Sequence, residues 1–412
     1  MSFISASRWR DVYVAAAARG VSACGDFLAA TALALVLQQA GAGGLAVSGL
    51  MLAASAPLAL LAPIAGRIAD RADSRTVLVV AGIAQTGVCA MLAFTSAPAV
   101  IIALVAVLAC GLAVTQPTLA ALLPAMVRRE DMARASGINQ TAAMIGVLAA
   151  PALAGVLVGQ FGARVPLLID AGSYLALVAA GLLIRTRRAT TARAAKVRWR
   201  VRDDSVIAVM IGALAATVAG VGAINVIEVF FIRETLHAST TIFGLVAASW
   251  SAGALIGAAI LGRRERGRAG SVRLVRLTLL LMAGCCTAVV AAAGVSHALL
   301  IVPLWLAGGF CNGGLNVYTS VVVAERVPAA ARGRAFATMS SATQGAGMIG
   351  FLVGGPLVEA FAPRPLVAAA GVAGLVAVLC CVAPVRRAGR EIAPSQTLGR
   401  PHPVAAGDSV GA

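Results

Sequence analysis

Several ionisable side chains lie well inside long apolar stretches of this sequence. Arg19 and Asp26 fall in the first such stretch, Asp170 in the sixth and Glu228 in the seventh. An ionisable group at the depth of a bilayer is costly, so it is a functional candidate by default. We therefore take Asp26, Glu228, Arg19 and Asp170 as the candidates for binding a proton or a substrate.

Asp26 is the strongest candidate for carrying a proton. Arg19 lies seven residues earlier, which is two helical turns and therefore the same helix face. The two side chains could line one polar wall, although about 10 Å of axial rise is too long for an easy direct contact. The alternative is that both are structural and pair with the backbone or with Ser22.

The other two acids have equally plain alternatives. Glu228 follows Asn225 and could face a central cavity, or it could lie near the membrane interface, close to Arg233 and Glu234. Asp170 lies only about five residues into its apolar stretch, and its alternative is a structural role in capping or packing.

The composition indicates an integral membrane protein. The 412 residues are 60% hydrophobic and 12% charged, whereas a soluble protein carries roughly 25% charged residues. Apolar runs of about 20 residues recur, each long enough to cross a bilayer as a helix. We predict an all-α protein with twelve transmembrane helices, at about 12–36, 45–66, 76–95, 99–123, 135–159, 165–184, 205–231, 242–262, 273–294, 299–323, 335–360 and 365–384.

The placement of positive charge sets the predicted orientation. The net charge is +17 and there are 33 Lys and Arg, which on a soluble surface would indicate nucleic-acid binding. Here all but Arg19, Arg164, Arg233 and Arg364 lie in the termini or in alternate loops. Basic loops stay cytoplasmic. We therefore expect both termini inside, an even number of spans and no nucleic-acid partner.

A basic segment divides the chain into two halves. We predict an N-terminal six-helix bundle at 1–184, a cytoplasmic linker at 185–204, a C-terminal six-helix bundle at 205–385 and a disordered cytoplasmic tail at 386–412. Segments 49–67 and 244–263 resemble each other, as do 144–151 and 348–356, which indicates an internal repeat. Neither the Cys nor the His spacing indicates a metal site or disulfide, and we expect no cofactor.

The loop after the second span resembles a motif of the major facilitator superfamily, G-x-x-x-D-R-x-G-R-R/K. Here it reads Gly66-Arg-Ile-Ala-Asp70-Arg71-Ala-Asp-Ser-Arg75, with an acid at position 73 where the superfamily usually has Gly. The resemblance implies two pseudo-symmetric six-helix bundles. It also implies a cytoplasmic gate in which Gly66, Asp70, Arg71 and Arg75 latch one of two packings.

The fifth span resembles the helix-5 motif of superfamily antiporters. Gly137, Gly146, Pro151 and Gly155 occupy its positions, with Ala at two others. Small residues at such spacings allow tight, kinked helix packing, which ordinary Gly/Ala packing would also explain. The resemblance favours export.

Two further stretches resemble the branch that contains the enterobactin exporter and macrolide efflux permeases. These are Arg19-Gly-Val-Ser-Ala-Cys-Gly-Asp26 and Phe161-Gly-Ala-Arg-Val-Pro-Leu-Leu-Ile-Asp170-Ala-Gly-Ser-Tyr. The resemblance implies proton-coupled export of small amphipathic molecules. It also favours a structural role for Asp170, in capping or packing. Many such exporters carry an Arg in helix 4, four residues before a Gly, where this chain has Val107, so coupling through that Arg is unsupported.

Neutral polar residues gather on spans expected to line a cavity. Asn312 and Asn316 are four apart and so share a helix face, although helix–helix hydrogen bonds explain many such residues. The predicted cavity-lining set is Asn139, Gln140, Asn225, Asn312, Asn316, Tyr318 and Gln344.

We expect a secondary transporter that exports a small-molecule substrate by proton antiport with alternating access. An importer of the same fold and a non-transporting membrane sensor or scaffold are the alternatives, and paired catalytic residues for an enzyme are lacking. A single Lys among the 33 basic residues and abundant Ala indicate a GC-rich bacterial genome. We therefore expect the protein in the bacterial cytoplasmic membrane, in contact with lipid, working as a monomer.

Overall fold

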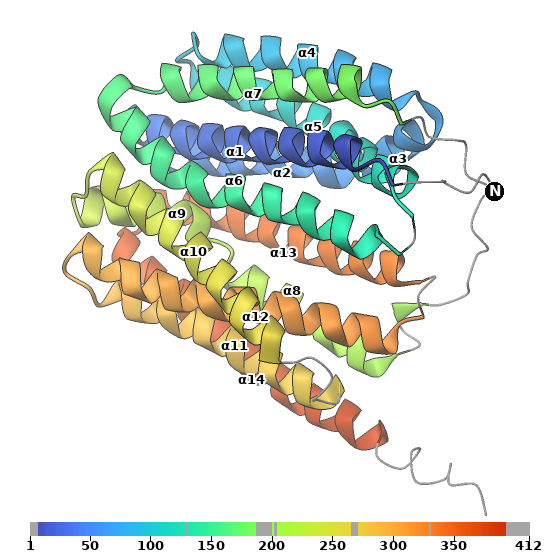
Figure 1. The fold of residues 1–412 in the computed structure, drawn as a ribbon. Helices are drawn as coiled ribbons and strands as arrows, with labels where there is room; N and C mark the ends of the chain where they lie inside the picture. The colour runs from blue at the N-terminus through green and yellow to red at the C-terminus, as the bar shows by residue number, and fades with distance from the viewer. Residues whose placement is uncertain are drawn as a thin grey trace, which may run out of the picture.

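A computed structural model describes residues 7–128, 130–186, 200–201, 204–264, 271–328 and 331–392. These residues form long helices in two groups, which lie one above the other in Figure 1. The predicted linker at 185–204 falls largely outside the described residues, as does the predicted tail after Ile392. The all-α membrane fold is confirmed.

The first group holds seven helices. Their bounds are α1 Trp9–Gln39, α2 Gly43–Leu60, α3 Ala62–Arg71, α4 Ser74–Leu92, α5 Pro98–Met126, α6 Met132–Phe161 and α7 Arg164–Leu183. We call this group the N-half. Its helices pack as α1 with α6 and α7, α4 with α5 and α7, and α2 with α5.

The second group, the C-half, repeats this plan. Its elements are α8 Ser205–Val221, α9 Ile224–Phe230, a π-helical turn η2 Phe231–Thr235, α10 Thr240–Arg264, α11 Ser271–Ala293, a 3-10 turn η3 Ala298–Leu300, α12 Ile301–Arg326, α13 Arg332–Ala360 and α14 Pro363–Ile392. Here α10 and α11 pack on α12, and α8 packs on α13 and α14.

The twelve predicted spans correspond to these helices, but two of them are broken. The second span bends at Leu61 between α2 and α3, where Pro57 and Pro63 remove backbone donors. The seventh span breaks after α8, where Gly222 lies against Gly350 of α13. Within the described residues, eleven segments are long and apolar enough to cross a membrane. Helix α13 is not among them, because its first half carries several Ser, Thr and Gln residues.

The two ends of the bundle differ in charge. One end, the basic side, holds the start of α1 and the ends of α3, α5 and α12, with Arg8, Arg71, Arg128 and Arg326. The other, the far side, holds the turns at 40–42, 93–97, 162–163, 236–239, 294–297 and 361–362. Helix α14 reaches Ile392, past the predicted start of the tail at residue 386.

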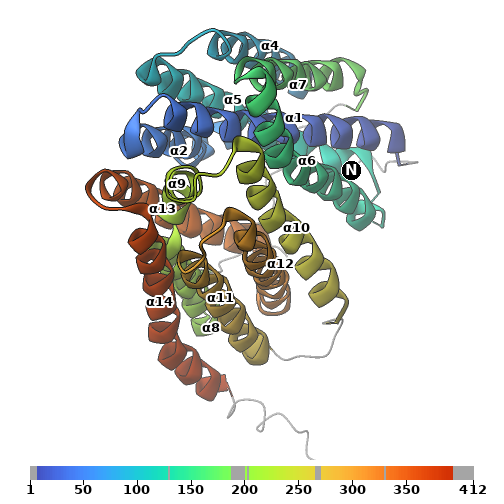
Figure 2. The same cartoon turned by 90° about the vertical axis from the view of Figure 1, so that its left-hand side faces the viewer.

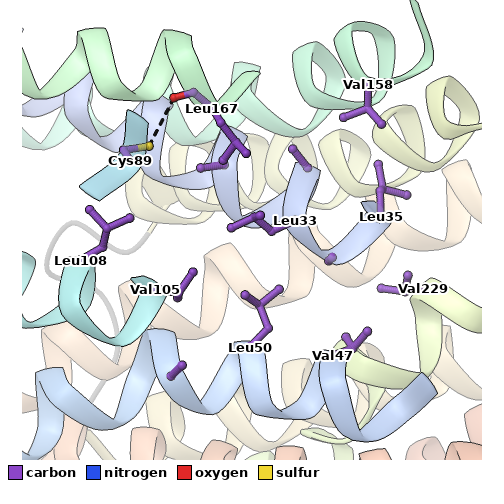
Figure 3. Packing of buried hydrophobic residues seen from close by; sticks show 14 of the residues in the cluster. Leu33, Leu35, Val47, Leu50, Cys89, Val105, Leu108, Val158, Leu167 and Val229 are labelled. Carbon is purple, nitrogen blue, oxygen red and sulfur yellow. Dashed lines mark hydrogen bonds between the residues drawn. The ribbon is translucent and has the colours of Figure 1, made fainter. Parts of the chain in front are cut away.

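Among the described residues, the buried core is continuous between the halves only toward the far side. There, Leu35 of α1 and Val47 of α2 share one apolar cluster with Val229 of α9 and Trp305 of α12. Figure 3 shows part of this cluster, including Leu35, Val47 and Val229. Toward the basic side the C-half has a separate cluster, which includes Ile207, Leu279 and Val322.

Candidate functional site

A polar cluster lies inside the N-half, where α1, α4 and α7 meet. The Tyr174 hydroxyl donates a hydrogen bond to Asp26 Oδ1 at 2.6 Å. Asp170 accepts from Ser173 Oγ at 3.0 Å and from Cys89 Sγ at 3.2 Å. The structure thus brings the two predicted acids, Asp26 and Asp170, into one neighbourhood.

Helix geometry and one glycine position this cluster. Asp170, Ser173 and Tyr174 lie at spacings of three and four on α7 and therefore share a face. A Cβ at Gly25 would collide with Asp170 Oδ1 and Ser173 Oγ, so Gly25 is what lets α1 approach that face. The predicted packing role of Asp170 fits its 1% exposure.

The cluster can hold a proton. A carboxylate out of water is stable only when it is paired or hydrogen-bonded, and Asp26 accepts one recorded hydrogen bond, from a neutral hydroxyl. Asp26 is half-buried, whereas Asp170 is fully buried. Asp26 is therefore the more accessible of the two acids.

Tyr174 and Cys89 were not among the predicted site residues. Tyrosine and cysteine are ordinary in apolar helices, so their types gave no signal. For Tyr174 a signal did exist, because it follows Ser173 directly and lies one turn after Asp170.

Arg19 is not bonded to Asp26 in the structure. It is half-buried on α1, and its Nε has no hydrogen-bond partner among the described residues. Its neighbour Gly20 lies close to α6, where a Cβ would be 2.8 Å from the Ala142 carbonyl oxygen. A shared polar wall of Arg19 and Asp26 stays a prediction.

In the C-half, Glu228 is bonded to Trp305, whose ring contacts that of Trp250. Trp305 Nε1 donates to Glu228 Oε2 at 3.3 Å, and the Trp305 ring meets the Trp250 ring edge-on at 6.1 Å between centroids. Asn225, one turn before Glu228, is exposed and donates to the Gly222 carbonyl oxygen of its own span at 3.1 Å.

Most of the predicted cavity-lining residues are accessible, and one is not. Gln140, Asn316 and Gln344 are exposed, and Asn139 and Asn312 are half-buried. Asn316 Nδ2 donates to Asn312 Oδ1 at 3.3 Å and to the Asn312 carbonyl oxygen at 2.9 Å.

Tyr318 does not fit the predicted cavity-lining set. It is 5% exposed and belongs to the C-half core cluster. Its polar type suggested a cavity, but its position on α12 turns it into the bundle.

The predicted gate motif lies at the end of α3. Gly66 has no atom within 4 Å of where a Cβ would be, and Arg71 and Arg75 are exposed. The side chain of Asp70 lies outside the described part of the structure, so the latch stays a prediction. Asp73, unusual in the motif, caps α4 by accepting from Thr76 N at 3.3 Å and Thr76 Oγ1 at 3.1 Å.

The halves meet closely toward the far side. Pro151 and Gly155 of α6 pack on Gly244 of α10, where a Cβ at Gly155 would lie 2.9 Å from Gly244 Cα. Ser48 of α2 bonds to the Phe351 carbonyl oxygen on α13. Figure 2 looks from this side and shows α2 next to α13 and α6 crossing α10.

Polar contacts support the same closure. Gln38, at the end of α1, donates to Glu234 at 3.0 Å and accepts from Arg233 Nε at 3.4 Å. Glu359 accepts from Leu45 N at 3.1 Å. The glycines of the helix-5 motif on α6 serve two different contacts. Gly146 packs on α1 of its own half, whereas Gly155 packs on α10 of the other half.

Comparison with known families shows which family this chain belongs to. A family model described as "Transmembrane secretion effector", within the major facilitator superfamily, matches residues 4–406. The chain belongs to this family. The predicted superfamily is therefore confirmed.

Individual proteins resemble the chain more distantly. The Bacillus subtilis (strain 168) protein YfiS, an uncharacterized MFS-type transporter, is 24% identical over 359 residues, which cover 83% of this chain and 85% of YfiS. A bacterial homologue of the iron transporter ferroportin, solved in an inward-facing state, superposes with a TM-score of 0.73 at 17% identity, over 92% of this chain and 99% of its own.

Two more structures agree with this fold. A bacterial homologue of the human lysosomal transporter Spinster, inward-facing and unoccupied, gives a TM-score of 0.70 at 14% identity, over 96% of this chain and 99% of its own. The nucleoside transporter NupG, solved as a point mutant, gives 0.68 at 15% identity, over 93% of this chain and 99% of its own. At these identities the likeness shows the fold alone.

Proposed function

We propose that this protein is a secondary active transporter that exports small amphipathic molecules by proton antiport. Its substrates would be drug-like, macrolide-like or siderophore-like. The two halves would alternate between a packing closed at the far side and a packing closed at the basic side.

The observation that carries the proposal is the asymmetry of contact between the halves. They share an apolar core and close backbone contacts toward the far side. Toward the basic side, the C-half has an apolar cluster of its own, which includes no described residue of the N-half. This arrangement suits one state of an alternating-access cycle, and two of the similar structures carry the description inward-facing.

Asp26 is the proposed proton carrier. It lies near the middle of α1, is half-buried, and is held by the Tyr174 hydroxyl. A carboxyl group at this depth can release its proton only when water or a cation reaches it. Rocking of the halves would supply that access from alternate sides.

The charge pattern supports the proposed orientation. If the basic side faces the cytoplasm, the structure is open to the inside, where an exporter takes up its substrate. The protein would then span the bacterial cytoplasmic membrane with both termini inside and work as a monomer. The helix-5 motif and the branch-like stretches around Asp26 and Asp170 support export.

The test is dye efflux from energised cells that express the chain. Ethidium efflux should stop when a protonophore collapses the gradient, and Asp26→Asn should abolish it at equal expression. Glu130→Gln is the matched control, because Glu130 is an acid that lies 73% exposed in a surface ion pair. Normal efflux by Asp26→Asn would remove Asp26 from the mechanism.

The alternatives give different results in the same cells. An importer would raise the dye content of energised cells above that of cells lacking the protein. A non-transporting sensor or scaffold would change dye content in neither direction.

A further inference from the structure

Two of the eight cysteines meet inside the C-half. Cys285 lies on α11 and Cys311 on α12, two helices that pack against each other and lie side by side in Figure 2. The two thiols are within hydrogen-bond reach of each other. The spacing of the cysteines along the sequence did not predict this contact, because it depends on which helices are neighbours.

Two further contacts fix where these thiols lie. Cys285 Sγ donates a hydrogen bond at 3.2 Å to the carbonyl oxygen of Gly308, which precedes Cys311 by three residues on α12. From the other side, a Cβ at Gly284 of α11 would lie 2.7 Å from Cys311 Sγ and 3.7 Å from Cys311 Cβ. Each thiol therefore reaches the backbone of the opposite helix, and the glycine at residue 284 leaves the room that Cys311 needs.

The cysteine next to this pair is directed elsewhere. Cys286 is fully buried, and its Sγ would lie 2.6 Å from a Cβ at Gly374 of α14. Cys285 and Cys311, in contrast, are half-buried, so part of each side chain is accessible to a small molecule. Cys286 is thus a matched control for a reaction of the pair.

Packing explains each cysteine singly, since a free cysteine behaves as a small apolar side chain. It does not require two thiols to meet. Thiols in contact have a reaction open to them that no other pair of packing residues has, which is closure to a disulfide. The S–S bond is about 2.05 Å long, so closure brings the two hydrogen-bonded sulfurs closer together.

We propose that Cys285 and Cys311 are an oxidisable dithiol that closes to a disulfide between α11 and α12. Two S–H bonds break and one S–S bond forms, while two electrons and two protons pass to the oxidant. The pair lies in the middle third of both helices, where charged groups are costly. The oxidant is therefore a neutral two-electron acceptor that enters apolar surroundings, such as a quinone, which becomes the hydroquinone.

The disulfide would restrain α12 from a second side. Its opposite contact, with α10, is already close, because a Cβ at Gly309 or Gly313 would collide with the carbonyl oxygens of Trp250 and Ala254. Oxidation would hold α12 to α11 as well, and so restrict its movement within the C-half. This inference concerns the thiols themselves and does not depend on the proposed transport function.

The test is thiol counting on the purified full-length protein in detergent. Diamide is the neutral oxidant, since its N=N bond takes up the two electrons and two protons. The protein is then denatured, its free thiols are alkylated with N-ethylmaleimide, and the intact mass is measured. Oxidised wild type should lose two of its eight alkylated thiols. Chymotryptic peptides that contain Cys285 and Cys311 should be joined, and dithiothreitol should separate them.

Single substitutions identify the partners. Cys285→Ser and Cys311→Ser should each keep all their remaining thiols under the same treatment, whereas Cys286→Ser should still lose two. The inference is overturned if wild type keeps all eight thiols, if Cys311 is joined to a cysteine other than Cys285, or if Cys286→Ser loses the cross-link. The peptide map of wild type needs no variant, so the test holds even where a variant misfolds.

Discussion

The contact between α6 and α10 gives the sharpest prediction, for Gly155→Ala. A Cβ at residue 155 would collide with the Thr240 carbonyl oxygen and lie 2.9 Å from Gly244 Cα, about 0.5 Å inside ordinary contact. Overpacking of this kind costs about 1–3 kcal/mol. Each 1.4 kcal/mol changes an equilibrium constant tenfold. The population of the state closed at the far side should therefore fall about 5- to 150-fold relative to that of the open state.

Gly137→Ala is the matched control on the same helix. No atom lies within 4 Å of a Cβ at residue 137. Replacing Gly by Ala inside a helix stabilises it by about 0.5–1 kcal/mol. That gain is common to both variants and cancels in the comparison.

The assay is electron-spin distance measurement across the far side. Spin labels at Ser96→Cys and Ser296→Cys would report on exposed turns of the N-half and C-half, after the native cysteines are replaced. We expect a longer distance to become dominant in Gly155→Ala only. An unchanged distance distribution in Gly155→Ala, or an equal change in Gly137→Ala, would refute the idea that the contact between α6 and α10 closes the far side.

Three other predictions follow from the polar contacts. Tyr174→Phe removes the 2.6 Å bond to Asp26 and should lower the free energy of unfolding by about 1 kcal/mol and slow efflux; an unchanged efflux rate would contradict it. Asp204→Ala removes the cap of α8 and the 2.8 Å ion pair with Arg326, so thermal unfolding should show a loss of about 1–3 kcal/mol; a Tm equal to wild type would argue against it. Gly25→Ala should reduce the yield of folded protein by size-exclusion chromatography, whereas Gly172→Ala, where no neighbour lies within 4 Å, should not; equal yields would count against the packing of α1 on α7.

The sequence predicted the helices well because bilayer-spanning segments must be long and apolar. It did not predict the breaks. The bend at Leu61 depends on how the helix accommodates two prolines, and the break after Val221 depends on the approach of Gly350 from α13. The second is a tertiary contact, which hydropathy does not encode.

The same distinction explains the site. Asp26, Asp170 and Glu228 could be found from sequence because a charge in an apolar run is rare. Trp305 could not, and Tyr174 only through its spacing from Asp170, since their roles depend on which helices are neighbours. Tyr318 was misplaced for the same reason, because a helix has one face toward the core and one away from it, and its residue type does not say which.

Proton-driven transport through Asp26 is the central claim, and reconstitution tests it most directly. Purified protein in liposomes, with an imposed pH gradient and no other energy source, should move ethidium against its concentration gradient as protons flow the other way. Asp26→Asn should show neither flux, and Glu130→Gln should show both. Ethidium movement that is independent of the pH gradient, or equal in Asp26→Asn and wild type, would contradict the account.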